Sequence, residues 1–262
     1  MHKTRLIIAA ILLPILYLVI KILPLSIFTL FIAFIAIAAL FEFLSMYKVK
    51  PIFCYVFSLA GAIPIILSYL NINIGISLIT SIFMLVTIVR LFIKKDTKNA
   101  LLDVSPLLIG FFYIPVLLTY FVKLRVMGSN WVIFLCLVVW GADSFAYYIG
   151  KGYGKKRLYE SVSPKKTMAG AYGAFGGAIL ISYLLNLILN LTSSVILIII
   201  CGAILSISGI IGDLVESMFK RDAGIKDSST IIPGHGGFLD KVDAMLFSAP
   251  ILYYFIKFFI MG

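Results

Sequence analysis

Long apolar runs recur along almost the whole of this chain, and each is about as long as a helix must be to cross a bilayer. The hydrocarbon core is ~30 Å thick, which a helix of ~20 residues spans, and the backbone inside it must satisfy its own hydrogen bonds. We therefore predict an all-α polytopic integral membrane protein with about nine transmembrane helices. The expected spans are residues 5–22, 25–45, 52–70, 73–93, 101–122, 130–149, 170–190, 194–216 and 241–260.

The composition leaves no room for a separate soluble domain. Of the 262 residues, 62% are hydrophobic and only 13% are charged, whereas a soluble domain has about 25% charged residues. We predict a single membrane domain over residues 1–262, in which residues 1–130 form a scaffold and residues 131–262 carry the chemistry. Residues 1–22 have the charge pattern of a signal peptide but no small-residue cleavage site, so we interpret them as a retained first helix.

The distribution of Lys and Arg predicts the orientation of the chain. With a cytoplasmic N-terminus, 18 of the 22 Lys and Arg residues fall on the cytoplasmic side, as the positive-inside rule requires. The C-terminus then lies on the opposite side, and the long polar segments at about 150–169 and 217–240 both face the cytoplasm. We attribute the net charge of +11 to this orientation and to contact with anionic membrane lipids. We expect no nucleic-acid partner, because no basic patch lies on a soluble fold.

Acidic residues are concentrated in one stretch, residues 212–243, which holds six of the eleven Asp and Glu residues. Asp213 and Glu216 are spaced i, i+3 near the end of one expected helix, and Asp240 and Asp243 have the same spacing at the start of the next. Residues three apart share a helix face, and a Gly-rich loop joins the two pairs. Carboxylate oxygens are the ligands that Mg²⁺ prefers, so this stretch indicates a metal and phosphate site.

A second interpretation of the same acids is that they cap helices and form surface ion pairs. Asp240 alone could be an N-cap, because negative charge is favourable at a helix N-terminus. This interpretation explains Asp213 and Glu216 poorly, since they adjoin a long apolar run and carboxylates at membrane depth are costly. His235 could contact phosphate or form local hydrogen bonds, and as weaker alternatives it could bind a metal or act as a general acid or base.

The second polar segment, residues 140–177, is basic and rich in glycine. Asp143 is the lone acid of its expected helix, and the cations that follow it are Lys151, Lys155, Lys156, Arg157, Lys165 and Lys166, with the hydroxyl of Thr167 after them. Such a loop can be a lipid-headgroup patch, but its glycines and the nearby acidic stretch favour a cradle for a polyphosphate. We expect Gly170, Gly173, Gly176 and Gly177 to serve close helix packing.

These segments together resemble the phosphatidate cytidylyltransferase (CDP-diacylglycerol synthase) family. The resemblance rests on a long motif and two upstream elements. The motif reads Gly212-Asp213-Leu214-x-Glu216-Ser217-x-x-Lys220-Arg221, then Lys226-Asp227, Pro233-x-His235-Gly236-Gly237 and Asp240-x-x-Asp243, and the upstream elements are Asp143-Ser144-Phe145-Ala146-Tyr147 and Ser163-Pro164-Lys165-Lys166-Thr167. The resemblance covers residues 140–243 in motif terms. This chain departs from the family pattern at Lys241, where the family usually has Arg, and at Ala169, where it usually has Glu.

The resemblance implies the reaction CTP + phosphatidate → CDP-diacylglycerol + pyrophosphate, which belongs to phospholipid biosynthesis and requires Mg²⁺, with K⁺ as a further candidate cation. Such transfer depends mainly on positioning and charge neutralisation. The implied metal ligands are Asp213, Asp240 and Asp243. The other implied catalytic residues are Lys226 and Asp227. The implied substrate-binding residues are Asp143, Lys165, Lys166, Thr167, Ser217, Lys220, Arg221, His235, Gly236 and Gly237.

Two other functions fit parts of the sequence. A CTP-dependent polyprenol or phytol kinase would use related chemistry on a lipid alcohol, and a cation transporter would use Asp213 and Asp240 as an ion site. The full acidic and basic motif argues against the kinase, and the lack of matching charges on the opposite side argues against the transporter. We expect a multi-pass enzyme of the cell (inner) membrane with its active site facing the cytoplasm, and we consider a homodimer as its assembly.

Overall fold

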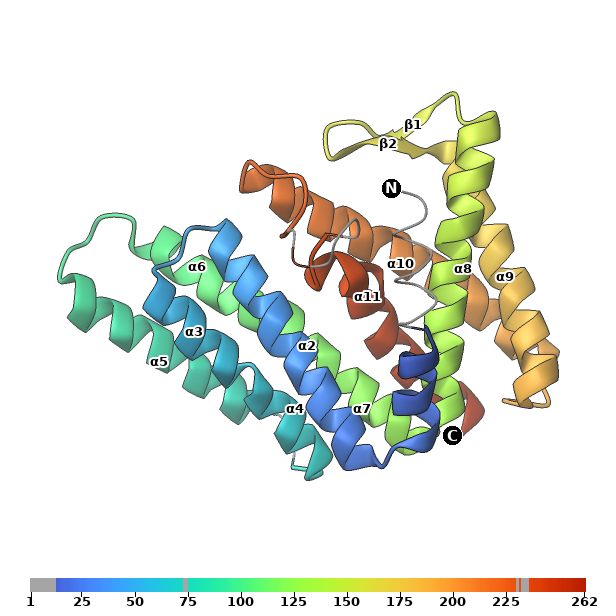
Figure 1. The fold of residues 1–262 in the computed structure, drawn as a ribbon, viewed down its shortest axis with the longest axis horizontal. Coiled ribbons are helices and arrows are strands. Elements are labelled where there is room, and N and C mark those ends of the chain that lie inside the picture. The colour runs from blue at the N-terminus through green and yellow to red at the C-terminus, as the bar shows by residue number, and fades with distance from the viewer. Residues whose placement is uncertain (1–12, 73–74, 230, 232–235) are drawn as a thin grey trace. The chain divides into compact units, whose positions relative to one another are not determined.

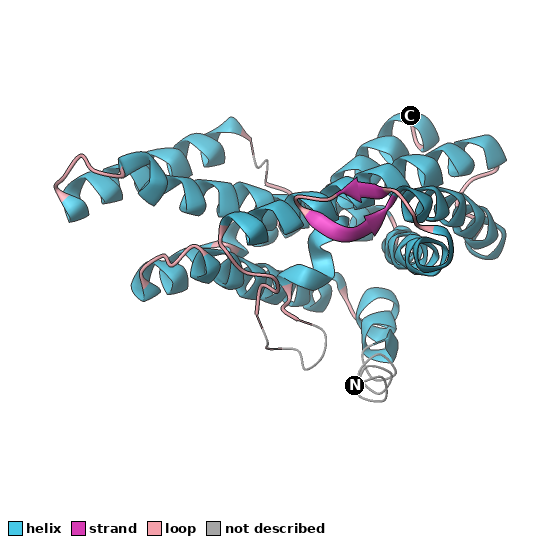
Figure 2. Ribbon diagram, turned by 90° about the horizontal axis from the view of Figure 1, so that it is seen from above, coloured by secondary structure: helices cyan, strands magenta, loops and turns pink. Residues whose placement is uncertain are grey.

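Apolar helices dominate the computed structural model, which describes residues 13–72, 75–229, 231 and 236–262. Eight helical segments in this part of the chain are long and apolar enough to cross a bilayer, and only one short pair of strands accompanies them (Figure 2). The prediction of an all-α polytopic membrane protein is thereby confirmed. The orientation of the chain in the membrane remains a prediction.

The eight candidate spans agree closely with the predicted ones. They are Leu25–Met46, Pro51–Tyr69, Ile76–Lys94, Ala100–Met127, Ser129–Tyr153, Met168–Leu189, Val195–Asp222 and Leu239–Ile260. The helices that end at Met127 and Asp222 run five and six residues further than predicted, because a helix can continue beyond the apolar run that marks the span. The predicted ninth span, residues 5–22, lies partly outside the described residues, which include a short apolar helix at Leu13–Ile22.

The chain forms two units, which we describe separately. Unit 1 consists of Met1–Lys123 and Asp227–Asp240, and unit 2 consists of Leu124–Lys226 and Lys241–Gly262. The first boundary lies close to the predicted division at residue 130, but residues 227–240 join the N-terminal unit rather than the C-terminal half. A single membrane domain over residues 1–262 remains a prediction.

In unit 1, helix α2 packs against α3, α4 and α6, and α5 packs against α6 (Figure 1). The elements are the π-helical turn Leu18–Ile22, α2 (Leu25–Met46), α3 (Pro51–Ala60), α4 (Ala62–Tyr69), α5 (Ile76–Lys94), α6 (Ala100–Phe111), the π-helical turn Phe112–Val116 and the first part of α7 (Leu117–Met127). Pro115 lies in the second π-helical turn, where the lost backbone hydrogen bond of a proline is accommodated. Gly61 separates α3 from α4, and a Cβ there would lie 3.1 Å from the Pro115 side chain.

In unit 2, helix α9 packs along both α8 and α10 (Figure 1). The elements are α8 (Ser129–Tyr153), β1 (Arg157–Tyr159), β2 (Ser163–Thr167), α9 (Met168–Leu189), α10 (Val195–Asp222), α11 (Leu239–Phe255, which starts in unit 1) and the π-helical turn Ile256–Ile260. The strands β1 and β2 pair antiparallel. This hairpin was not predicted, since its charged residues lack the apolar alternation of an ordinary strand.

Glycines on α9 allow α8 to approach closely. An added Cβ would lie 2.5 Å from the Phe145 ring at Gly177 and 2.8 Å from the Ile149 Cβ at Gly173. An added Cβ at Gly170 would likewise lie 2.9 Å from the backbone of α8. The prediction that these glycines serve helix packing is confirmed for these three residues. It is wrong for Gly176, where an added Cβ meets no atom within 4 Å.

Candidate active site

A cavity of about 560 Å³ opens in unit 2 between the hairpin and helices α8, α9 and α10. Its volume falls within the ~300–1,000 Å³ of ordinary ligand pockets. The lining residues are mostly those of the second polar segment. They include Asp143, Tyr147, Gly150, Lys151, Gly154, Arg157, Lys165, Lys166, Thr167, Gly170 and Asp213. The cavity therefore brings together five of the predicted site residues: Asp143, Lys165, Lys166, Thr167 and Asp213.

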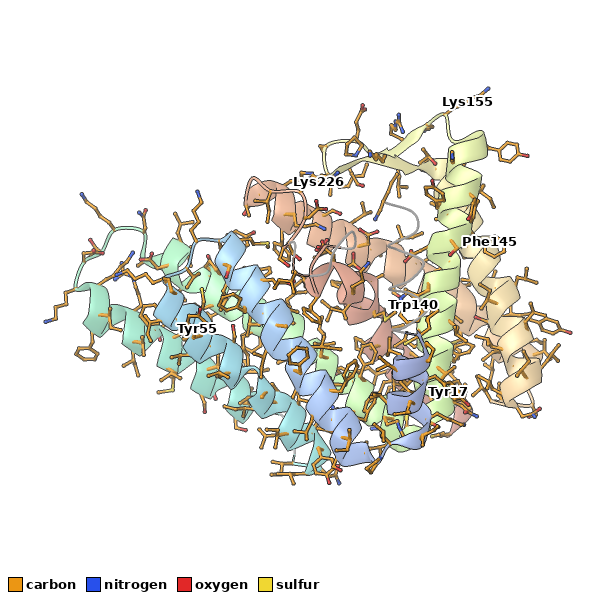
Figure 3. The ribbon with its side chains drawn as sticks, viewed as in Figure 1. Tyr17, Tyr55, Trp140, Phe145, Lys155 and Lys226 are labelled. Carbon is orange, nitrogen blue, oxygen red and sulfur yellow. The ribbon has the colours of Figure 1, made fainter. Side chains whose placement is uncertain are left out.

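The hairpin positions the basic side chains of the cavity. Thr167 ends β2 and also caps α9, because its buried side chain accepts a hydrogen bond of 3.1 Å from the backbone N–H of Gly170. The C-terminal end of α8 packs against this cap, since an added Cβ at Gly150 would lie 3.0 Å from the Thr167 Oγ1 and one at Gly154 only 2.5 Å from it. Lys155 extends from the connection between α8 and β1 (Figure 3) and does not line the cavity.

Three carboxylates meet beside the cavity. Asp213 and Glu216 on α10 and Asp243 on α11 each place an oxygen within 4.8 Å of the other two. The three carboxylates come together because α10 and α11 approach each other closely. An added Cβ at Gly212 would lie 2.7 Å from the carbonyl oxygen of Asp243, and the hydroxyls of Ser208 and Ser248 lie 3.0 Å apart at the same helix pair.

Two lysines offset the negative charge of this cluster. Lys166 forms an ion pair with Asp213, and Lys220 forms one with Glu216, which is fully buried. The hydroxyl of Ser217 also donates to Asp213, at 3.3 Å. Buried charges are tolerated only when they are paired or bind a metal, and the two lysines, from β2 and α10, pair with two of the three carboxylates.

The composition of the cluster fits a hard divalent cation. Three carboxylates supply oxygen ligands of the kind that Mg²⁺ and Ca²⁺ take, and Asp213 lies at the cavity wall, where a substrate phosphate can complete the coordination. Two of the three predicted metal ligands, Asp213 and Asp243, belong to this cluster. Glu216 is the third member, although the sequence favoured Asp240 for the metal set.

Asp240 lies in unit 1, at the start of α11, and its Oδ2 accepts several hydrogen bonds there. The donors are the backbone N–H of Ser228 at 3.1 Å, the Ser228 hydroxyl at 2.9 Å and the backbone N–H of Gly237 at 2.8 Å. Asp240 therefore does not act as the N-cap through this oxygen, because it lies within the first turn of α11 and these donors precede the helix. Its role as a metal ligand remains a prediction.

Glu42 on α2 is an acid that was not among the site residues predicted from the sequence. Its side chain is buried and accepts four hydrogen bonds from residues that come almost two hundred positions later. The donors are the Ser229 hydroxyl at 2.7 Å, the Ser228 hydroxyl at 3.0 Å, and the backbone N–H groups of Phe238 at 3.0 Å and Leu239 at 2.9 Å. The Ser228 hydroxyl has one proton, which it shares between Glu42 and Asp240. Glu42 thereby caps α11 from α2. The available signal was an acid inside an apolar helical run.

Gly236 and Gly237 were predicted to let the backbone approach a phosphate. In the structure, Gly236 has a φ of +84°, which favours glycine. An added Cβ at Gly237 would collide with the Glu42 carboxylate and the Ser228 hydroxyl. Packing against Glu42 is therefore sufficient to require glycine at position 237. Phosphate contact by either glycine remains a prediction.

The remaining predicted residues have varied surroundings. The Nε of Arg221 donates to the carbonyl of Val162 at 3.3 Å and its Nη1 donates to the carbonyl of Ile225 at 2.9 Å, so this side chain joins α10 to the turn of the hairpin. Lys226 follows α10 and is exposed (Figure 3). Asp227 in unit 1 is also exposed. His235 lies outside the described residues.

The comparison with known proteins agrees with these motifs. Residues 3–259 match the model of the cytidylyltransferase family. The phosphatidate cytidylyltransferase of Bacillus subtilis is 32% identical over 246 residues, which cover 88% of this chain and 89% of the relative. That of Staphylococcus epidermidis is 33% identical over 228 residues, covering 85% and 87%. That of Synechocystis is 37% identical over 185 residues, covering 59% and 62%.

The family match spans nearly the whole chain and includes both the basic cavity and the carboxylate cluster. The chain belongs to the cytidylyltransferase family.

Proposed function

We propose that this protein is a phosphatidate cytidylyltransferase, which converts CTP and phosphatidate to CDP-diacylglycerol and pyrophosphate. The observation that carries the proposal is the cavity of unit 2, where basic side chains of the hairpin face the carboxylate of Asp213. That carboxylate in turn belongs to the cluster with Glu216 and Asp243. Cations and carboxylates at one cavity suit a metal-bound triphosphate.

Both proposed substrates are anions, so the site must first overcome their mutual repulsion. Four cationic residues line the cavity, namely Lys151, Arg157, Lys165 and Lys166, against the two acids Asp143 and Asp213. We assign Lys165, Lys166 and Arg157 to the phosphates of CTP and of the lipid. Arginine and lysine both bind phosphate, arginine through two parallel hydrogen bonds and lysine as a point charge.

The reaction is a substitution at the α-phosphorus of CTP. An oxygen of the phosphatidate phosphate forms the new P–O bond, and the bond between the α-phosphorus and the bridging oxygen breaks, so that pyrophosphate leaves with the electron pair. Phosphoryl transfer needs positioning and charge stabilisation more than covalent participation by the protein. Lys166 is placed for both tasks, because it lines the cavity and holds the Asp213 carboxylate.

We assign Mg²⁺ to the cluster of Asp213, Glu216 and Asp243. When bound, Mg²⁺ neutralises phosphate charge and orients the triphosphate. Asp240, Asp227 and Lys226 retain their sequence-based assignments as further catalytic residues, and K⁺ remains a candidate second cation. We also propose that the site faces the cytoplasm of a cell membrane, where CTP is available, and that the protein acts as a homodimer.

A direct assay tests the proposal. Protein purified in detergent should convert labelled CTP and phosphatidate to CDP-diacylglycerol only when Mg²⁺ is present. Asp213→Asn should reduce turnover by at least a hundredfold, whereas Asp222→Asn, at an exposed acid of the same helix, should retain it. Both variants are checked for folding by size-exclusion chromatography and thermal unfolding.

The alternatives have their own signatures in the same preparation. Phosphorylation of a lipid alcohol without cytidylyl transfer would identify a CTP-dependent kinase instead. Ion flux in liposomes without turnover would identify a transporter. Near-normal turnover by Asp213→Asn would overturn the assignment of Asp213 to the metal site.

A further inference from the structure

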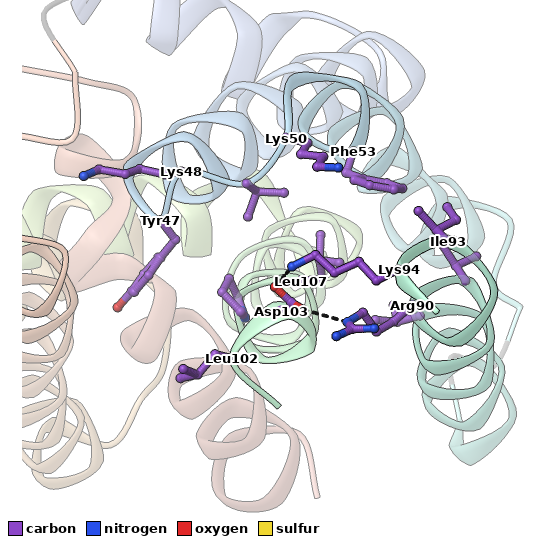
Figure 4. A pocket seen from close by; sticks show the side chains of 14 residues that line it. Tyr47, Lys48, Lys50, Phe53, Arg90, Ile93, Lys94, Leu102, Asp103 and Leu107 are labelled. Carbon is purple, nitrogen blue, oxygen red and sulfur yellow. Dashed lines mark hydrogen bonds and ion pairs between the residues drawn. The ribbon is translucent and has the colours of Figure 1, made fainter. Parts of the chain in front are cut away.

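A second cavity, of about 260 Å³, lies in unit 1, and neither the motif nor the proposed reaction uses it. It is formed by the turn between α2 and α3, the C-terminal end of α5 and the first turns of α6 (Figure 4). Its lining combines several cations with apolar side chains, and the only acid among the lining residues is Asp103. The cations are Lys48, Lys50, Arg90 and Lys94.

Asp103 organises the floor of this cavity. Its Oδ2 accepts a hydrogen bond of 2.6 Å from the Nε of Arg90, and its Oδ1 accepts one of 2.6 Å from the Nζ of Lys94 (Figure 4). The Nη2 of Arg90 also binds the Asp96 carboxylate at 2.8 Å and the Lys98 carbonyl at 2.8 Å. The guanidinium of Arg90 thus links α5, the following turn and α6 through these hydrogen bonds.

The other cationic side chains of the cavity can still donate hydrogen bonds to a ligand. Lys94 can donate three hydrogen bonds, and the described structure assigns only one of these, to Asp103. Lys48 and Lys50 are exposed, and no ion pair is seen for either within the described residues. Since Asp103 is already shared between Arg90 and Lys94, the cavity retains a positive charge that protein groups do not balance.

The apolar part of the lining indicates an amphipathic ligand. Phe53, Val86, Val89, Ile93, Leu102 and Leu107 contribute walls beside these cations. The cavity also lies where two candidate spans end, at Met46 and Lys94, so it is placed at a boundary between hydrocarbon and water. Basic pockets between helices at such a boundary are typical sites for anionic lipid headgroups.

We propose that this cavity binds the phosphate-bearing headgroup of an anionic phospholipid, with the first part of its acyl chains along the apolar wall. Lys48, Lys50 and Lys94 contact the phosphate, and Arg90 with Asp103 keeps the cavity open. A volume of about 260 Å³ is below the ~300–1,000 Å³ of pockets for drug-sized ligands, which suits a headgroup rather than a whole lipid. The site is independent of the proposed catalytic reaction.

A binding measurement with a matched control tests this site. The protein in neutral detergent is titrated with dioctanoyl phosphatidylglycerol, and binding is followed by native mass spectrometry. The test variant is Lys48→Gln/Lys50→Gln. The control is Lys95→Gln/Lys98→Gln, which removes the same charge from exposed residues of the neighbouring turn that do not line the cavity.

The test variant should bind the lipid about thirtyfold more weakly, because each Lys near a membrane surface contributes about 1 kcal/mol to attraction of anionic lipid. The control should bind within about threefold of the unaltered protein. Equally weakened lipid binding in both variants would overturn the proposed site, because it would show that only the net charge of the protein matters.

Two further probes define the ligand. Dioctanoyl phosphatidylcholine, which has a neutral headgroup, should bind at least tenfold more weakly than phosphatidylglycerol. Glycerol 3-phosphate, which lacks acyl chains, should also bind at least tenfold more weakly. Equal binding of phosphatidylcholine would overturn the anionic specificity, and equal binding of glycerol 3-phosphate would assign the cavity to a soluble phosphate ester instead of a lipid.

Discussion

Replacement of Glu42 by Gln is the sharpest test of how the segment 228–239 is held. The carboxylate of Glu42 accepts two hydrogen bonds on each oxygen, from the hydroxyls of Ser228 and Ser229 and from the backbone N–H groups of Phe238 and Leu239. A Gln amide keeps one acceptor oxygen but turns the other position into a donor. In Glu42→Gln, one backbone N–H therefore faces an N–H₂ group and loses its partner, whereas the Ser hydroxyl on the same side can rotate and accept from that group.

The magnitude follows from the number of bonds lost. A hydrogen bond to a charged group contributes about 1.5–3 kcal/mol, so the loss of one predicts a destabilisation of about 1.5–3 kcal/mol. Native proteins are stable by only about 5–15 kcal/mol. The N-terminus of α11 carries the two backbone donors, so we expect the effect to concentrate at residues 227–240.

The assay combines hydrogen exchange with turnover. Glu42→Gln should speed amide exchange in peptides that cover residues 227–240 by at least about tenfold and lower kcat more than it changes KM for CTP. Ser229→Ala removes one hydroxyl bond to the carboxylate, which also contributes about 1.5–3 kcal/mol, but it leaves both backbone N–H groups of α11 bonded and should therefore speed exchange less than Glu42→Gln does. Glu42→Asp, which keeps the charge on a shorter side chain, should restore part of the protection.

Unchanged exchange at residues 227–240 in Glu42→Gln would refute this reasoning. A uniform loss of protection over the whole chain would also contradict it, because that result would describe general destabilisation rather than release of one segment. A fall in kcat with unchanged exchange would show that Glu42 acts in some way other than by positioning this segment.

Three further predictions address unit 2. Lys166→Gln should raise KM for CTP at least tenfold because it removes a cation that lines the cavity and pairs with Asp213, and Lys155→Gln, outside the cavity, should leave steady-state kinetics unchanged. Gly177→Ala should lower the thermal stability by about 1–3 kcal/mol because its methyl group would overlap the Phe145 ring, whereas Gly176→Ala meets open space and should be neutral or slightly stabilising. Removal of divalent cations with EDTA should abolish CDP-diacylglycerol formation, and added Mg²⁺ should restore it; turnover that persists in EDTA would exclude the metal assignment.

The spans and the motif residues could be predicted from the sequence because both depend on local information. An apolar run of ~20 residues has few structures open to it inside a bilayer, so the ends of most helices were predicted to within about four residues. The basic segment around Lys165, Lys166 and Thr167 was likewise recognised from residue types and spacing, and the cavity of unit 2 contains all three.

The sequence could not predict which carboxylates form the cluster. The i, i+3 spacing places Asp213 and Glu216 on one face of their helix, and Asp240 and Asp243 on one face of the next. The spacing does not say which member of each pair meets a carboxylate of the other helix. Which oxygens meet depends on the packing of α10 against α11, where Gly212 lets the helices approach and brings Asp243 beside Asp213. Asp240 is engaged instead by Ser228 and Gly237.

The sequence by itself therefore determined the class of fold, the approximate spans and the chemical character of the acidic and basic segments. The tertiary structure decided which of those residues lie together, that a hairpin carries the lysines, and that Glu42 binds residues 228–239. The physical reason is that hydropathy and helix spacing are properties of neighbouring residues. A carboxylate on α2 and its donors almost two hundred residues later meet only through packing of the folded chain.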